Sequence, residues 1–102
     1  MTESLENRSA DDEVRITARI TGVVQGVGFR YWTARKADEL MLRGTVRNNR
    51  DGSVQLVAEG PVSDAEALVS WLHSARAPGR IENMEFDVSD ATGEFEEFRI
   101  VG

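Results

Sequence analysis

Apolar and polar side chains alternate along residues 14–21. The apolar positions are Val14, Ile16, Ala18 and Ile20. This period of two is typical of a strand with one buried face. From Arg30 to Leu42 the apolar residues recur at helical spacing instead, and no glycine or proline interrupts them. The pattern therefore predicts a strand, a short glycine-containing connection and a helix.

A β-hairpin is expected next. Residues 44–49 and 52–59 flank the dipeptide Asp51-Gly52, which tolerates positive φ and is a strong signal for a tight turn between strands. In the second arm, alternate residues again fall on opposite faces. Pro61 ends this arm, because proline cannot donate to a strand ladder.

A second helix is predicted from Ser63 to about Ala75. Ser63 and Glu66 have the spacing of a capping box, in which each side chain satisfies a backbone amide at the helix start. The core-facing positions follow helical spacing: Ala65, Leu68, Val69 and Leu72. Pro78-Gly79 is expected to terminate the helix.

Two closing stretches, 81–88 and 95–101, carry apolar residues at strand positions. The element order is βαββαβ with a last short strand. This order favours an α+β fold, a ferredoxin-like βαββαβ sandwich, with an antiparallel sheet of four to five strands and two helices on one face.

Composition limits the class of protein. The 102 residues suffice for one domain. We expect a disordered acidic tail over residues 1–13 and the folded domain over 14–102, because the first segment is polar. There is no cysteine, and His73 is the only histidine, so we expect a cytoplasmic protein without metal or cofactor. No apolar run is long enough to span a membrane.

The net charge of −6 is unevenly distributed. Residues 1–13 contain one arginine and five acidic residues, residues 14–80 contain ten basic and six acidic residues, and residues 81–102 contain one basic and seven acidic residues. The acidic total argues against a general nucleic-acid binder. The basic middle segment is where an anion site would be favoured.

The connection before the first helix contains the candidate chemistry. Three glycines, at positions 22, 26 and 28, precede Arg30, so consecutive backbone N–H groups and one guanidinium can surround a small anion. The run lacks the Lys-Ser/Thr of a Walker P-loop and the spacing of a dinucleotide fingerprint. The alternative to an anion site is that the glycines only allow the strand and the helix to pack closely.

Two ordered motifs in the chain resemble those of the acylphosphatase family. The first is the run GVVQGVGFR ending at Arg30, and the second is GTVRNNRDGSV from Gly44 to Val54. The resemblance covers residues 14 to 101. It implies an acylphosphatase that hydrolyses small acyl phosphates to a carboxylate and inorganic phosphate, with inorganic phosphate also acting as an inhibitor, and that works as a monomer.

The resemblance also implies roles for particular residues. Arg30 is expected to bind the phosphate and Asn48 to orient the attacking water, whose proton the phosphate itself takes. The expected phosphate-binding loop comprises Gln25, Gly26, Val27, Gly28, Phe29 and Arg30. No metal is implied. Phosphoryl transfer to water needs mainly positioning and charge stabilisation, so few functional groups suffice.

The chain departs from the family pattern at three places. Leu40-Met41-Leu42 lacks the usual glycine after the first helix, Thr45 replaces an aromatic residue, and residues 77–80 replace a familiar bend. Two other functions stay open. An RNA-recognition module shares the element order, although the central strands here lack its stacking aromatics. The second open function is a module of the same fold that binds an anion or a partner without catalysing a reaction.

Overall fold

The secondary structure follows the predicted order, including the last short strand. The computed structural model describes residue 5, residues 8–74 and residues 76–102. The elements are, in chain order, β1 (Glu13–Val23), α1 (Phe29–Glu39), β2 (Arg43–Asn48), β3 (Val54–Pro61), α2 (Val62–Leu72), β4 (Arg80–Asp90) and β5 (Phe98–Val101).

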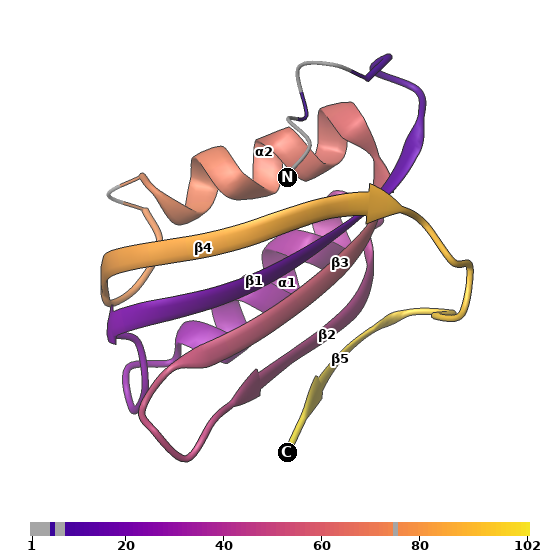
Figure 1. Cartoon of the computed structure of the whole chain (residues 1–102). Helices are drawn as coiled ribbons and strands as arrows, with labels where there is room; N and C mark the ends of the chain where they lie inside the picture. Colours follow the sequence, from indigo (N-terminus) through magenta and orange to yellow (C-terminus); the bar gives the residue numbers. More distant parts are fainter. Residues whose placement is uncertain (1–4, 6–7, 75) are drawn as a thin grey trace.

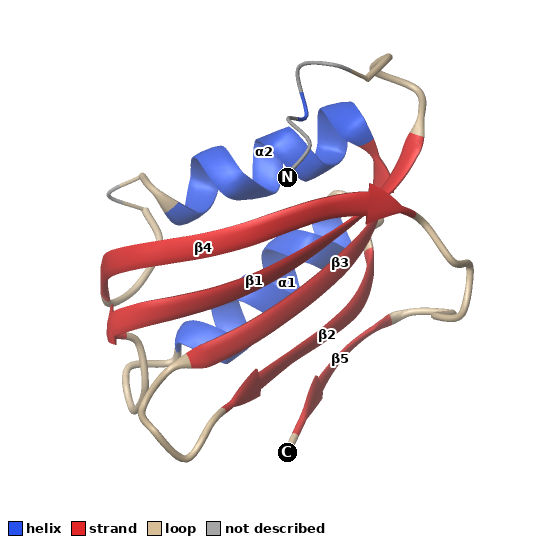
Figure 2. Ribbon diagram, viewed as in Figure 1, coloured by secondary structure: helices blue, strands red, loops and turns tan. Residues whose placement is uncertain are grey.

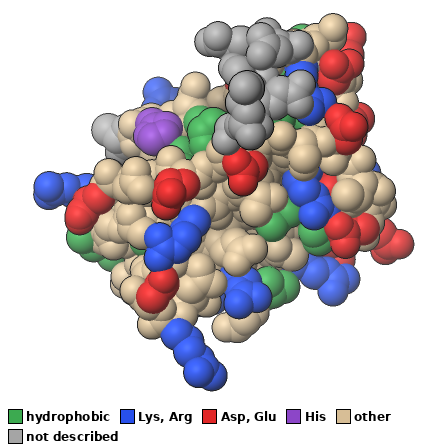
Figure 3. All heavy atoms as spheres, viewed as in Figure 1, with side chains coloured by type: hydrophobic (Ala, Val, Ile, Leu, Met, Phe, Trp, Pro, Cys, Tyr) green, Lys and Arg blue, Asp and Glu red, His purple; other side chains and the backbone are tan. Residues whose placement is uncertain are grey.

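The strands form a single sheet in the order β4-β1-β3-β2-β5. Both helices lie behind the sheet in Figure 1, on the same face, and Figure 2 shows the opposite face free of helices. On that open face, basic and acidic side chains are interspersed with only small hydrophobic areas between them (Figure 3). The predicted α+β sandwich with two helices on one face is confirmed.

The core lies between the sheet and the two helices. The alternating residues of β1 are all buried and pair with small or branched residues of β3, for example Ala18 with Leu56 and Ile20 with Val54. Phe29 and Leu68 enter the core from the two helices, each about 1% exposed or less. The period-two pattern of the first strand therefore identified the buried face correctly.

The fifth strand differs from the prediction. It pairs with β2 in parallel, with Gly44 opposite Phe98 and Val46 opposite Ile100, so the sheet is mixed and not purely antiparallel. It begins at Phe98 and not near residue 95. Residues 91–97 connect it to β4, across the open end of the sheet, and this crossing is what reverses the direction of the last strand.

The first helix ends at Glu39, three residues before the predicted end. Met41 has a positive φ of 57° and is 82% exposed. Its N–H donates to the carbonyl of Asp38, and the N–H of Leu42 donates to the carbonyl of Ala37, each at 2.9 Å. This is a Schellman motif in which methionine occupies the left-handed position that usually belongs to glycine. The helix thus ends without its customary glycine.

The predicted capping box at the second helix is wrong. The helix begins at Val62, and no side chain caps it. The backbone N–H groups of Val62 and Ser63 donate instead to the carbonyls of Asp12 and Ala10, at 2.9 and 3.2 Å. Backbone acceptors from a distant segment have replaced the side-chain cap, which local sequence does not reveal.

Part of the predicted disordered tail lies outside the described residues, namely 1–4, 6 and 7, so its disorder stays a prediction there. Within the described residues, Arg8 forms an ion pair with Asp90 at 2.8 Å, and Leu5 packs against the core. Residues 8–12 therefore contact the domain, and the boundary at residue 13 stays a prediction.

The second helix ends at Leu72, with His73 as its C-cap. Pro78-Gly79 therefore does not terminate it, and these residues lead into β4. The predicted end at Ala75 lies outside the described residues. On α1, Trp32 is 46% exposed and does not join the core.

Candidate active site

The connection between β1 and α1 is shaped by two glycines. Gly26 and Gly28 have φ of 76° and 79°, a left-handed conformation that costs little only for glycine. Gly28 is the N-cap of α1, and no side chain caps this helix. The chain therefore turns tightly and presents its backbone at the helix N-terminus.

The backbone amides of this connection are unpaired. In the part of the chain that the structure describes, none of the N–H groups of residues 25–30 donates to a protein acceptor. Amides that converge at a helix N-terminus, where the helix dipole is positive, form a site for a small anion. The first turn of α1 also contains no acidic residue that would occupy such a site.

Arg30 is in the first turn of α1 and is partly exposed. Among residues 8–74 and 76–102 its guanidinium has no acidic partner. A cation at a helix N-terminus is opposed by the helix dipole, so this position is unfavourable unless an anion binds there. Arg30 and the free amides would serve the same anion.

Asn48 is the last residue of β2. Its side-chain oxygen, Oδ1, is buried and has no hydrogen-bond partner within the described residues. An unpaired buried acceptor is costly, which points to a water or ligand hydrogen as its partner.

Arg30 and Asn48 line the same cavity, of about 180 Å³. Its lining is completed by residues of the connection, of α1 and of β5. The whole set is Val24, Gly26, Gly28, Phe29, Arg30, Tyr31, Asn48 and Ile100. Of the loop residues expected from the sequence, Gln25 and Val27 are not part of this lining. The topology thus brings together Arg30 of the first motif and Asn48 of the second, which are 18 positions apart in the sequence.

Gln25 has a different function in the structure. Its side-chain Nε2 donates to the carbonyls of Asn49 and Ser53, each at 2.9 Å. Asn49 and Ser53 flank the β2–β3 turn, and Asn49 Nδ2 also donates to Ser53 Oγ at 2.9 Å. Gln25 therefore ties the glycine-containing connection to the turn that follows Asn48, a contact that no local sequence pattern indicates.

Asp51 stabilises that turn. It accepts hydrogen bonds from the hydroxyl and the backbone N–H of Ser53, at 2.6 and 2.9 Å, and pairs with Arg19. The hydroxyl and amide of Ser53, followed by the Arg19 guanidinium, hold the pKa of the Asp51 carboxyl far below its ordinary value. Asp51 is therefore an ionised turn residue and not a general base.

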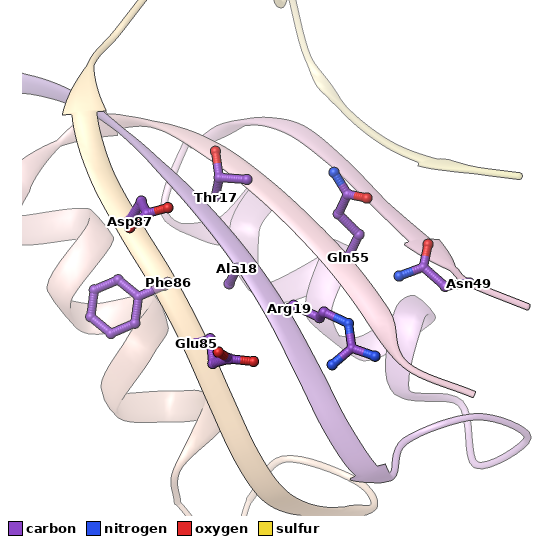
Figure 4. A pocket seen from close by; sticks show the side chains of 8 residues that line it. All are labelled: Thr17, Ala18, Arg19, Asn49, Gln55, Glu85, Phe86 and Asp87. Carbon is purple, nitrogen blue, oxygen red and sulfur yellow. The ribbon is translucent and has the colours of Figure 1, made fainter. Parts of the chain in front are cut away.

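A separate hollow of about 530 Å³ lies over the open face of the sheet. Figure 4 shows Thr17, Arg19 and Gln55 on β1 and β3, with Glu85 and Asp87 on the neighbouring β4. Among the residues that the structure describes, the lining of this hollow includes none from a helix and none from the connection between β1 and α1. His73 lines another hollow, at the end of α2. Neither place has the features of the cavity at α1.

The fold and this cavity together define an α+β sandwich with a candidate anion site between its first strand and first helix. The family model for acylphosphatase matches residues 16–100. The chain is 72% identical over 91 residues to an acylphosphatase of Paenarthrobacter aurescens (strain TC1), covering 89% of this chain and 97% of the relative.

Other relatives agree. An acylphosphatase of Arthrobacter sp. (strain FB24) is 55% identical over 95 residues, covering 93% of this chain and 87% of the relative. The crystal structure of an acylphosphatase from Bacillus subtilis superposes with a TM-score of 0.82 at 30% identity, covering 87% of this chain and 99% of that one. The chain therefore belongs to the acylphosphatase family, and it is a hydrolase of the carboxyl–phosphate bond of acyl phosphates.

Proposed function

We propose that the cavity at the N-terminus of α1 is the active site, in which Arg30 and the amides of residues 25–30 bind the phosphoryl group and Asn48 holds the attacking water. One observation supports this most strongly. Counting partners among the described residues only, a guanidinium without an acidic partner, unpaired backbone amides and an unpaired buried amide oxygen belong to one cavity of about 180 Å³. Each of these groups lacks a partner that a phosphate or a water would supply.

The phosphoryl group would be held by charge and by hydrogen bonds. In phosphoryl transfer, negative charge spreads over the equatorial oxygens, and donors fixed in advance stabilise it without reorganisation. The amides supply such donors, and the planar guanidinium of Arg30 can donate two parallel hydrogen bonds to one phosphoryl group. Lysine cannot reproduce that fork.

Asn48 would orient the nucleophile. Its Oδ1 accepts a hydrogen from the water, so that the lone pair of the water oxygen points toward phosphorus. The new P–O bond forms as the bond between phosphorus and the carboxyl oxygen breaks. The carboxylate leaves as a stable anion and needs no general acid, and the proton of the water passes to a phosphate oxygen. No side chain with a raised pKa is required.

The test compares Asn48→Ala with Arg30→Lys, using benzoyl phosphate as substrate and inorganic phosphate as inhibitor. Asn48→Ala should lower kcat by about 100-fold while phosphate inhibits as before, because the water and not the anion has lost its partner. Arg30→Lys should weaken both phosphate inhibition and turnover. Matching circular dichroism spectra and unfolding midpoints show that both variants are folded.

Two results would contradict these roles. A normal kcat in Asn48→Ala would mean that another group holds the water. A normal kcat in Arg30→Lys would mean that only the positive charge at this position matters and that two parallel hydrogen bonds from the guanidinium are not needed. A module that only binds an anion would bind phosphate and turn over nothing, even as wild type.

We further propose that the enzyme acts in the cytoplasm as a monomer and that inorganic phosphate is both product and inhibitor. The absence of cysteine suits a reducing compartment. No helix in the described ranges is long and apolar enough to cross a membrane. Size-exclusion chromatography with light scattering measures the molar mass in solution and so tests whether the protein is a monomer.

A further inference from the structure

The lining of the cavity at α1 combines polar and apolar residues. Gly26, Gly28, Arg30 and Asn48 provide the polar part. The apolar part of the lining is Val24, Phe29, Tyr31 and Ile100. The anion would use only the first part, and nothing in the phosphate chemistry calls for the second.

Two of the apolar residues are at the opening of the cavity. Val24 and Phe29 are each 1% exposed and form part of the core, whereas Tyr31 is 53% and Ile100 45% exposed. They come from separate elements, Tyr31 from the first turn of α1 and Ile100 from β5. Large apolar side chains left exposed on opposite elements around one opening indicate a surface that becomes buried when a ligand binds.

The ring of Tyr31 is held in place. It lies edge-to-face with the ring of Trp32, with centroids 5.1 Å apart and planes at 86°. Its hydroxyl accepts a long hydrogen bond of 3.4 Å from Arg35 Nη1, and the Arg35 guanidinium lies 5.6 Å from the centroid of the Trp32 ring. A ring braced by its neighbours loses little freedom when it contacts a ligand.

An acyl phosphate also has a charged part, the phosphoryl group, and a second part, the acyl substituent, that can be apolar. In an acyl phosphate, the acyl carbon is joined to phosphorus through a single oxygen. When the polar residues hold the phosphoryl group, the acyl substituent therefore extends toward the opening of the cavity. Arg30 is the only cationic side chain among the described residues of the lining, and the phosphoryl group would occupy it, so the acyl substituent meets mainly apolar side chains.

We infer, on the basis of the proposed active site, that Tyr31 and Ile100 form the subsite for the acyl group and determine specificity. The preferred substrates are acyl phosphates with an uncharged apolar substituent, aromatic or branched aliphatic. Tyr31 contacts the flat face of an aromatic group, and Ile100 covers it from β5. A small acyl group such as acetyl is too short to contact Tyr31 or Ile100.

The experiment measures kcat/KM for benzoyl phosphate and for acetyl phosphate in each variant. Comparing the benzoyl-to-acetyl ratio between variant and wild type cancels the intrinsic reactivities of the two substrates. Tyr31→Ala should lower the ratio by about 5- to 10-fold, the scale of one aromatic contact, mainly through KM. Ile100→Ala should lower it by about 3-fold, as expected for a partly buried aliphatic group.

Three controls accompany these variants. Tyr31→Phe keeps the ring and should keep the ratio. Met41→Ala removes an exposed apolar side chain at the other end of α1 and should change nothing. Matching circular dichroism spectra and unfolding midpoints show that Tyr31→Ala and Ile100→Ala are folded.

The subsite is refuted if both substrates lose the same factor, or if the ratio stays within 2-fold of wild type in Tyr31→Ala and Ile100→Ala. These results leave the roles of Arg30 and Asn48 standing. Conversely, if Arg30→Lys and Asn48→Ala retain full activity while the ratio falls in Tyr31→Ala, the proposed roles fail and the acyl subsite holds. A wild type that hydrolyses neither substrate overturns both.

Discussion

Replacing the buried Glu59 of β3 by glutamine should destabilise the protein strongly at neutral pH and only slightly at low pH. The Glu59 side chain is fully buried. Its carboxylate accepts hydrogen bonds from Arg15 Nε at 2.7 Å and from Thr92 N, Thr92 Oγ1 and Gly93 N, each at 3.0 Å. These donors attach the connection between β4 and β5 to the middle of the sheet.

The magnitude follows from the acidity of this group. Burial by itself raises the pKa of the Glu59 carboxyl, but the Thr92 amide, the Arg15 guanidinium and the Gly93 amide outweigh it and lower the pKa to about 2. Against the ordinary value of 4.5, this corresponds to about 3 kcal/mol of stability. Because the folded-state pKa is depressed, this stability is complete above about pH 5 and is lost as pH falls toward 2.

The assay is urea unfolding, followed by circular dichroism, of wild type and Glu59→Gln at pH 7, 5, 4 and 3. We expect a difference of about 3 kcal/mol at pH 7 that shrinks below pH 4.5. Glu94 also binds Arg15, which lowers the pKa of its carboxyl, but it is present in both proteins and largely cancels. The control Glu97→Gln breaks an exposed pair with Arg99 and should cost less than about 1 kcal/mol.

Two results would refute this reasoning. A cost below about 1 kcal/mol at pH 7 would mean that glutamine satisfies the same donors without charge. A cost that does not change between pH 5 and pH 3 would mean that it arises from packing and not from the ionised carboxylate.

Three further predictions follow from other contacts. Met41→Gly should raise the unfolding midpoint by about 4 °C at unchanged kcat, because glycine adopts the left-handed conformation without strain; a lower midpoint would contradict this. Deletion of residues 1–12 should lower the unfolding midpoint by about 4–8 °C, because the amides of Val62 and Ser63 lose their carbonyl partners. An unchanged midpoint would mean that water replaces these partners fully. Gln25→Ala should lower kcat/KM by about 10-fold with a small change in midpoint, because the connection is no longer tied to the β2–β3 turn, and a normal kcat/KM would show that this tie is dispensable.

The parts of the fold that local pattern controls were predictable. The alternation in β1 identified the buried face, and Asp51-Gly52 marked the turn after Asn48. The two motifs indicated Arg30 and Asn48, and the structure brings both to one cavity. For the strand and the turn, the signal depends on residues close in sequence, whose periodicity or turn chemistry reflects their own environment. Arg30 and Asn48 were indicated instead by the resemblance of the two motifs to those of the acylphosphatase family.

The parts that depend on distant segments were not predictable. Alternation in β3 placed Glu59 on the face opposite Leu56 and Ala58, yet residues 92 and 93 cover that position and bury Glu59. The start of α2 uses carbonyls from residues 10 and 12 and not its capping-box residues. The parallel pairing of β5 likewise depends on where residues 91–97 cross the sheet. No window of local sequence contains these partners.

The contacts around the proposed active site explain how its groups are held in place. Gln25 joins the amide-bearing connection to the carbonyls of Asn49 and Ser53, so the proposed phosphoryl site and the residue proposed to hold the water cannot move independently. Glu59 holds the segment that leads into β5, whose pairing with β2 brings Ile100 to the cavity. Misplacement by about 1 Å can cost on the order of 100-fold in rate. Residues that never touch the substrate should therefore affect turnover through geometry.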